Sequence, residues 1–137
     1  MKPRRTSYPA LDLGPLPVDA INRALGTELE PGNARLSRRA HRHIAEDHPE
    51  DYPACLQALR SGQVIAAPTY VGQAPDHSRN FEMIRRIGRR DGKVVLVAIG
   101  LEQDADGYYS VRSCYLLEPE KVEARRHEGR LKSVLPR

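Results

Sequence analysis

The chain has 137 residues, of which 39% are hydrophobic and 29% charged. This is enough apolar material for one compact core, and too much for a wholly disordered chain. The 22 basic and 18 acidic side chains give a net charge of +4, which favours polyanionic partners. Arginine accounts for 18 of the basic residues, and its planar fork suits phosphate groups, although the codon usage of a GC-rich genome explains the same excess.

The chain shows no sign of membrane insertion or export. Its longest apolar run, residues 94–99, is far shorter than the ~20 residues that cross a bilayer, and no apolar signal-peptide core follows Met1. We therefore expect a cytoplasmic location and no membrane partner. Cys55 and Cys114 fit no zinc spacing, so we expect reduced core cysteines, no disulfide, no metal and no cofactor.

The first segment of the chain is predicted to be a flexible arm. Residues 1–16 contain three prolines and no hydrophobic periodicity. We expect residues 17–137 to form a single domain, which agrees with the length of the chain.

Three short helices are predicted before any strand. Apolar residues recur at helical spacing over residues 18–25, and a glycine follows them. Ser37 is a natural N-cap for a second helix that runs to about Asp47. Pro53 begins a third helix, which Gly62 ends.

The second half of the chain is typical of strands. We expect them at residues 64–71, 81–86, 93–101 and 108–117. Asp91-Gly92 between two of these segments is a strong hairpin signal. A last helix over residues 120–127 precedes a frayed tail. The predicted fold class is α+β, with N-terminal helices followed by a four-stranded antiparallel sheet and a short C-terminal helix.

The predicted second helix carries the densest group of functional side chains. His43 and Asp47 lie four residues apart on one helix face, and His48 follows at the end of the helix. Phosphoryl transfer from a ribose 2′-OH needs a proton acceptor, a proton donor and cations. The two histidines can supply the first two, and the nearby Arg39 and Arg42 the cations. Alternatively, His43 is a packing residue and His48 caps the helix. A zinc site would lack further ligands.

A second group of candidate residues lies on the predicted strands. The two-residue repeat of a strand places Ser113 and Tyr115 on one face and Arg112 on the other. The hydroxyls can hold a phosphate and the tyrosine ring can stack on a base, although tyrosine is also common in strands for its propensity alone. Arg85 and Arg86 point to opposite faces, so one of them should reach a site on the sheet.

These segments together resemble the phage-type branch of the barnase, EndoU, colicin and RelE-like (BECR) ribonucleases. The resemblance covers about residues 34–132. It rests on the order and spacing of four motifs: His43-Ile44 with His48-Pro49, Val64-Ile65 with Pro68-Thr69-Tyr70-Val71-Gly72, Val94-Val95-Leu96-Val97, and Ser113-Cys114-Tyr115.

The resemblance implies a BECR-like fold and a metal-independent endoribonuclease, toxin-like or phage-effector-like, that forms 2′,3′-cyclic phosphate ends. It implies that the catalytic residues are His43, His48, Arg85, Arg86, Ser113 and Tyr115. We expect substrate to be bound by Tyr70, Arg39, Arg42, Lys93 and Arg112. The expected partners are RNA, with tRNA or rRNA as examples, and a cognate inhibitor or antitoxin.

Two alternatives to the nuclease remain open. One is a nucleic-acid-binding module of the same fold without catalysis, and the other is a dimerising structural protein. The sequence leaves the oligomeric state open.

Overall fold

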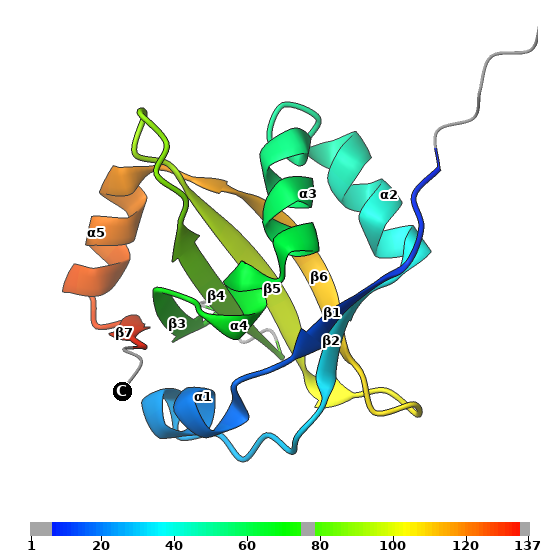
Figure 1. The fold of residues 1–137 in the computed structure, drawn as a ribbon. Helices are drawn as coiled ribbons and strands as arrows, with labels where there is room; N and C mark the ends of the chain where they lie inside the picture. Colours follow the sequence, from blue (N-terminus) through cyan, green and yellow to red (C-terminus); the bar gives the residue numbers. More distant parts are fainter. Residues whose placement is uncertain (1–6, 75–78, 135–137) are drawn as a thin grey trace, which may run out of the picture.

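A seven-stranded mixed sheet forms the centre of the protein in a computed structural model that describes residues 7–74 and 79–134 (Figure 1). The strands are β1 (Leu11–Pro15), β2 (Asn33–Leu36), β3 (Tyr70–Gln73), β4 (Asn80–Arg86), β5 (Val94–Gln103), β6 (Tyr109–Leu117) and β7 (Leu131–Ser133). The helices are α1 (Val18–Leu25), α2 (Arg38–Asp47), α3 (Tyr52–Ser61), α4 (Gln63–Ala66) and α5 (Pro119–His127). None of these helices is long and apolar enough to cross a membrane.

The sheet corrects the predicted fold class. Its strand order is β1-β2-β6-β5-β4-β3-β7, and β2 runs parallel to β6 whereas the other pairs are antiparallel. The prediction of a four-stranded antiparallel sheet is therefore wrong, because β1, β2 and β7 extend the β3–β6 meander. These three strands are only five, four and three residues long, too short for a residue pattern to indicate a strand by itself, so their pairing with other segments defines them.

The three predicted helices are confirmed as α1, α2 and α3, but the prediction that they precede every strand is wrong, because β1 comes before α1 and β2 before α2. Ser37 Oγ accepts a hydrogen bond from the backbone N–H of Ala40 at 3.1 Å, as expected of an N-cap. Gly26 and Gly62 end α1 and α3 in the left-handed region that favours glycine. Residues 64–67 do not form the predicted strand, because the chain turns at Gly62 directly into α4.

The segment predicted as an arm is fixed to the domain over part of its length. Strand β1, at residues 11–15, pairs with β2. Just before β1, the carbonyl oxygen of Pro9 accepts a hydrogen bond from Nδ1 of His41 at 2.8 Å. The His41 side chain, on α2, is buried, with 1% exposed. His41 Nε2 lies 2.6 Å from the Tyr52 hydroxyl, and the Tyr8 ring packs edge-on against the imidazole. Residues 1–6 of the predicted arm lie outside the described residues.

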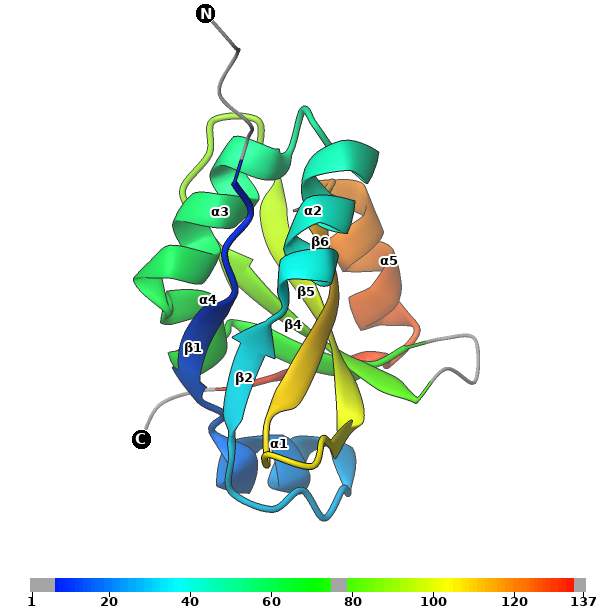
Figure 2. The same ribbon diagram turned by 90° about the vertical axis from the view of Figure 1, so that its right-hand side faces the viewer.

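The sheet has one fully covered face and one partly covered face. The larger core fills the space between the sheet and helices α1 to α4, and it includes Phe81, Met83 and Val97. On the opposite face a smaller core forms under α5, around Ile84 and Leu96. Figure 2 shows α3 and α4 on one side of the sheet and α5 on the other. The rest of the second face is not covered by α5. We therefore expect a site on the sheet to lie in this uncovered part.

The β4–β5 loop gives a testable dependence of stability on pH. Asp91 accepts hydrogen bonds from Arg89 Nη2 at 2.9 Å and from the backbone N–H of Lys93 at 3.0 Å, which together lower the pKa of the Asp91 carboxyl to about 2. Because this is below the unfolded value of 3.8, the carboxylate stabilises the fold above about pH 4, and that contribution is lost as the pH falls through about 2.

We therefore expect Asp91→Asn to show a flatter dependence of stability on pH between about pH 4 and 2 than the wild-type protein. Urea unfolding midpoints of both proteins, measured at about pH 4 and about pH 2, give the loss of stability of each protein over this range. Equal pH dependence in the two proteins would contradict this role for Asp91.

Candidate functional site

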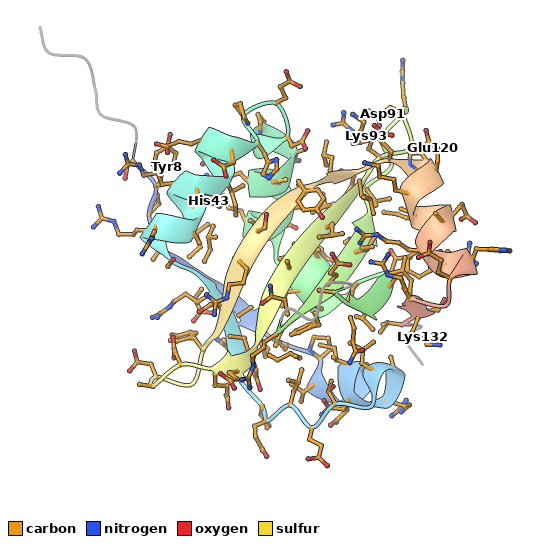
Figure 3. The ribbon with its side chains drawn as sticks, turned by 180° about the vertical axis from the view of Figure 1, so that it is seen from behind. Tyr8, His43, Asp91, Lys93, Glu120 and Lys132 are labelled. Carbon is orange, nitrogen blue, oxygen red and sulfur yellow. The ribbon has the colours of Figure 1, made fainter. Side chains whose placement is uncertain are left out.

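A strip of the second sheet face lies between α2 and α5 and carries the polar side chains of the candidate site (Figure 3). We call this strip the open face. Its residues are Glu82 on β4, Ala98 and Gly100 on β5, and Arg112, Ser113 and Tyr115 on β6. Ser113, Tyr115 and Ala98 are half-buried and Arg112 is exposed, so solvent reaches the middle of the strip.

The strand register arranges these residues in rows. Glu82 lies opposite Ala98, which lies opposite Ser113. In the next row Leu96 lies opposite Tyr115. Two strand spacings of about 4.8 Å place the β4 and β6 backbones about 10 Å apart. Between them, the Ala98 methyl group rises less far above the sheet than a larger side chain would. Functional side chains therefore lie on both sides of Ala98.

A buried ion pair borders the open face on the side of α5. Arg125 Nη1 lies 2.6 Å from Glu82 Oε1, and the side chains are 16% and 7% exposed. Burying two charges is costly unless they are paired, so the presence of Glu82 on a mostly apolar strand, with Arg125 of α5 against it, needs a reason. Sequence reasoning missed both residues. The available signal was a glutamate inside the otherwise apolar segment 81–84.

On the side of α2, an imidazole and a phenol lie together. His48 is half-buried and ends α2, and its ring centre lies 5.4 Å from that of Tyr115. Asp51 Oδ2 accepts a hydrogen bond from the backbone N–H of Leu116 at 3.1 Å, which attaches the α2–α3 corner to β6. This contact holds His48 over the open face. The structure thus brings together His48, Ser113 and Tyr115, three of the predicted catalytic residues.

The other predicted residues of α2 are exposed and engaged elsewhere. The His43 side chain is 54% exposed, and its Nε2 lies 3.1 Å from Asp47 Oδ2. Figure 3 shows His43 on α2, at the margin of the open face. Arg42 Nε donates to Glu46 Oε1 at 2.9 Å, and Arg39 is exposed. These side chains line the outside of the helix rather than the strip itself.

Arg85 and Arg86 point to opposite faces, as strand alternation predicts. Arg85 Nη1 donates to the carbonyl oxygen of Ala67 at 2.5 Å, on the side of the helical layer. Arg86 Nη2 donates to the Tyr70 hydroxyl at 2.9 Å on the side of α5, where Arg126 also contacts the Tyr70 ring. Tyr70 is only 6% exposed, so its ring positions two arginines and offers little surface for a base to stack on.

Lys93 and Arg112 lie at opposite ends of the strip. Lys93 is in the β4–β5 loop, close to Asp91 and the beginning of α5 (Figure 3).

The prediction that Arg112 faces away from Ser113 is wrong. The β5–β6 register shifts so that Ala98 pairs with Ser113 but Ile99 pairs with Val111, which makes Arg112 the extra residue of a bulge. Its guanidinium then lies over Gly100, on the open face.

Thiolate chemistry does not fit the cysteines. Cys55 and Cys114 are unbridged and buried. The hydrogen bond between the two thiols, together with burial, raises the pKa of Cys114 well above its ordinary value, so the nucleophilic thiolate is disfavoured. Within residues 7–74 and 79–134, no group of three or more His, Cys, Asp or Glu side chains is arranged to hold a metal ion.

Comparisons with known proteins give no family for the chain. No protein-family model matches it, and neither do any of the curated proteins or solved structures searched. The geometry of the open face is therefore the basis for proposing a function.

Proposed function

We propose that the protein is a metal-independent endoribonuclease whose cleavage centre is the open face. One observation carries the proposal: Glu82, paired with Arg125, and Ser113 lie on either side of the small Ala98 side chain, and the His48–Tyr115 pair lies one row along the same face. An imidazole, a carboxylate and a guanidinium around one space are the groups that transfer of a phosphodiester to a neighbouring hydroxyl requires.

In the proposed reaction, the ribose 2′-oxygen attacks the adjacent phosphorus. The Glu82 carboxylate takes the 2′-OH proton, and protonated His48 gives a proton to the departing 5′-oxygen. The P–O5′ bond breaks as the P–O2′ bond forms, which leaves a 2′,3′-cyclic phosphate and a 5′-OH. The Arg125 guanidinium and the Ser113 hydroxyl stabilise the charge that builds up on the phosphate oxygens. In this scheme Glu82 replaces His43 as the partner of His48.

The proposal includes the partners expected from the sequence. RNA is the substrate, with tRNA and rRNA as the first candidates, and a protein inhibitor would have to cover the open face. A cytoplasmic location is part of the same proposal, and the two unbridged cysteines support it because reducing compartments keep thiols free.

The test is to incubate the purified protein with total tRNA and rRNA in EDTA and to type the new ends chemically. We expect cleavage that leaves cyclic phosphate and 5′-OH ends, and we expect a His43→Ala/His48→Ala double variant to lose it. Intact RNA would contradict the proposal, as would cleavage that EDTA abolishes.

A second candidate function is nucleic-acid binding without catalysis. Arg86 and Arg126 are both held against the Tyr70 ring, an arrangement that gathers positive charge and involves no proton transfer. Intact RNA that is retained in a gel shift, with retention weakening as salt rises, would favour this candidate.

A further inference from the structure

The absence of a side chain at Gly100 determines where the Arg112 guanidinium lies. A Cβ atom at Gly100 would lie 3.3 Å from Arg112 Nε and 3.5 Å from Arg112 Nη2. The first distance is tighter than most contacts of a Cβ atom and the second is an ordinary van der Waals contact, so the guanidinium lies close to the β5 backbone. A Cβ atom alone would require the Arg112 guanidinium to shift by a few tenths of an ångström, and a branched side chain such as valine would displace it further.

The bulge in β6 supplies the other half of this arrangement. Because Arg112 is the extra residue between Val111 and Ser113, its side chain turns onto the same face as Ser113. Bulges typically re-aim a side chain in this way, and they are common beside active sites. Gly100 and the bulge together place a cation on the open face.

Arg112 keeps its hydrogen-bonding capacity for a ligand. It is exposed, and within the described parts of the chain it makes no ion pair and no side-chain hydrogen bond. The neighbouring Arg79 is neutralised by its ion pair with Glu102. A shallow pocket includes Arg112 and Gly100 together with Asn80, whose backbone pairs with Gly100. The pocket therefore has one uncompensated positive charge, which suits an anion.

We propose that Gly100 and Arg112 form a phosphate subsite that holds the RNA backbone one step away from the cleavage centre. Gly100 follows Ala98 by two residues on the same face of β5, about 7 Å along the strand, which is the scale of one nucleotide step. The subsite rests on the proposed function, because it needs a nucleic-acid strand on the open face. In it Arg112 binds a phosphate and Gly100 is a positioning residue.

The test uses a short fluorescent oligodeoxyribonucleotide, which lacks the 2′-OH and so cannot be cleaved by this route. Its affinity is measured by fluorescence anisotropy at several salt concentrations. Loss of one phosphate contact to a single strand reduces the slope of log Kd against log salt concentration by about 0.7. We expect this reduction for Arg112→Ala and for Gly100→Val, with no further reduction in the double variant.

The control is Arg60→Ala, which removes an exposed arginine from α3, in the layer that covers the opposite face. It should leave the slope unchanged. Arg112→Ala alters no residue of β5, so it remains a sound test if Gly100→Val fails to fold. Arg112→Lys should recover the slope, since the charge is restored, but only part of the affinity, since the planar fork is lost.

The outcomes separate the subsite from the nuclease. If the wild-type protein binds the strand and Arg112→Ala leaves the slope of log Kd against log salt concentration unchanged, the subsite is overturned and the nuclease proposal stands. Additive effects of the two substitutions would overturn the role of Gly100. Binding that depends on Arg112, in a protein that cleaves no RNA, would support the subsite and overturn the nuclease. A protein that binds no strand would overturn the subsite, and one that in addition cleaves no RNA would overturn both.

Discussion

Replacing His48 with alanine is expected to lower the rate of RNA cleavage by about 100-fold or more, because a positioned general acid or base contributes about 10²- to 10⁴-fold. The variant loses the imidazole that lies against Tyr115, and no other histidine is placed over the strip in the described part of the chain. Initial rates with the same RNA substrate, at equal enzyme concentrations, measure the effect.

His43→Ala is the matched control for this prediction. His43 belongs to the same helix and is paired with Asp47 on the exposed side, so we expect its removal to change the cleavage rate by less than about threefold. The reverse result, with His43 essential and His48 dispensable, would show that the cleavage centre lies on the outside of α2. Comparison of the two variants by circular dichroism checks that α2 is retained.

Arg125→Ala is expected to destabilise the protein by about 3 kcal/mol, which is the lower end of the range for breaking a buried ion pair. The substitution removes the guanidinium that lies 2.6 Å from Glu82 Oε1, while the carboxylate stays on the buried strand. Packing of the arginine stem against the sheet is lost as well. Urea unfolding of the variant and the wild-type protein measures the free-energy difference.

The neighbouring arginine provides the control for stability. Arg126 pairs with Glu123 and also contacts the Tyr70 ring, and both are partly exposed interactions, so Arg126→Ala should cost only about 1 kcal/mol. The double variant Glu82→Met/Arg125→Met should recover most of the lost stability, because apolar residues replace a buried pair at little cost. Equal effects of Arg125→Ala and Arg126→Ala would contradict the assignment of the Glu82–Arg125 pair as a buried interaction.

Local signals in the sequence predicted local structure well. The Ser37 cap and the glycines that end α1 and α3 depend on a few neighbouring residues, and these elements have the predicted type and nearly the predicted bounds. Strands β1 and β7 depend on partners far away in the chain, and a segment such as 131–133 carries too little pattern to indicate pairing with β3. The predicted four-stranded sheet failed for this reason.

In the candidate site too, local patterns predicted some features, whereas contacts between distant segments were not predictable from the sequence. Ser113 and Tyr115 share a face as strand alternation requires, but the bulge reversed the face expected for Arg112. The Glu82–Arg125 pair joins residues 43 positions apart, so no spacing rule relates them. The contact between His48 and Tyr115 likewise depends on how α2 packs against β6, which only the tertiary structure determines.

The position of α5 in the chain makes the proposed cleavage centre a late product of folding. The carboxylate of the central ion pair belongs to β4, whereas its guanidinium arrives only when α5, which follows β4 to β6 in the chain, docks beside the sheet and β7 pairs with β3. Contacts between such distant segments form slowly and after local structure. A chain that has formed only the β3–β6 meander therefore lacks a complete site. In a refolding experiment, the proposed ribonuclease activity should return no earlier than the docking of α5.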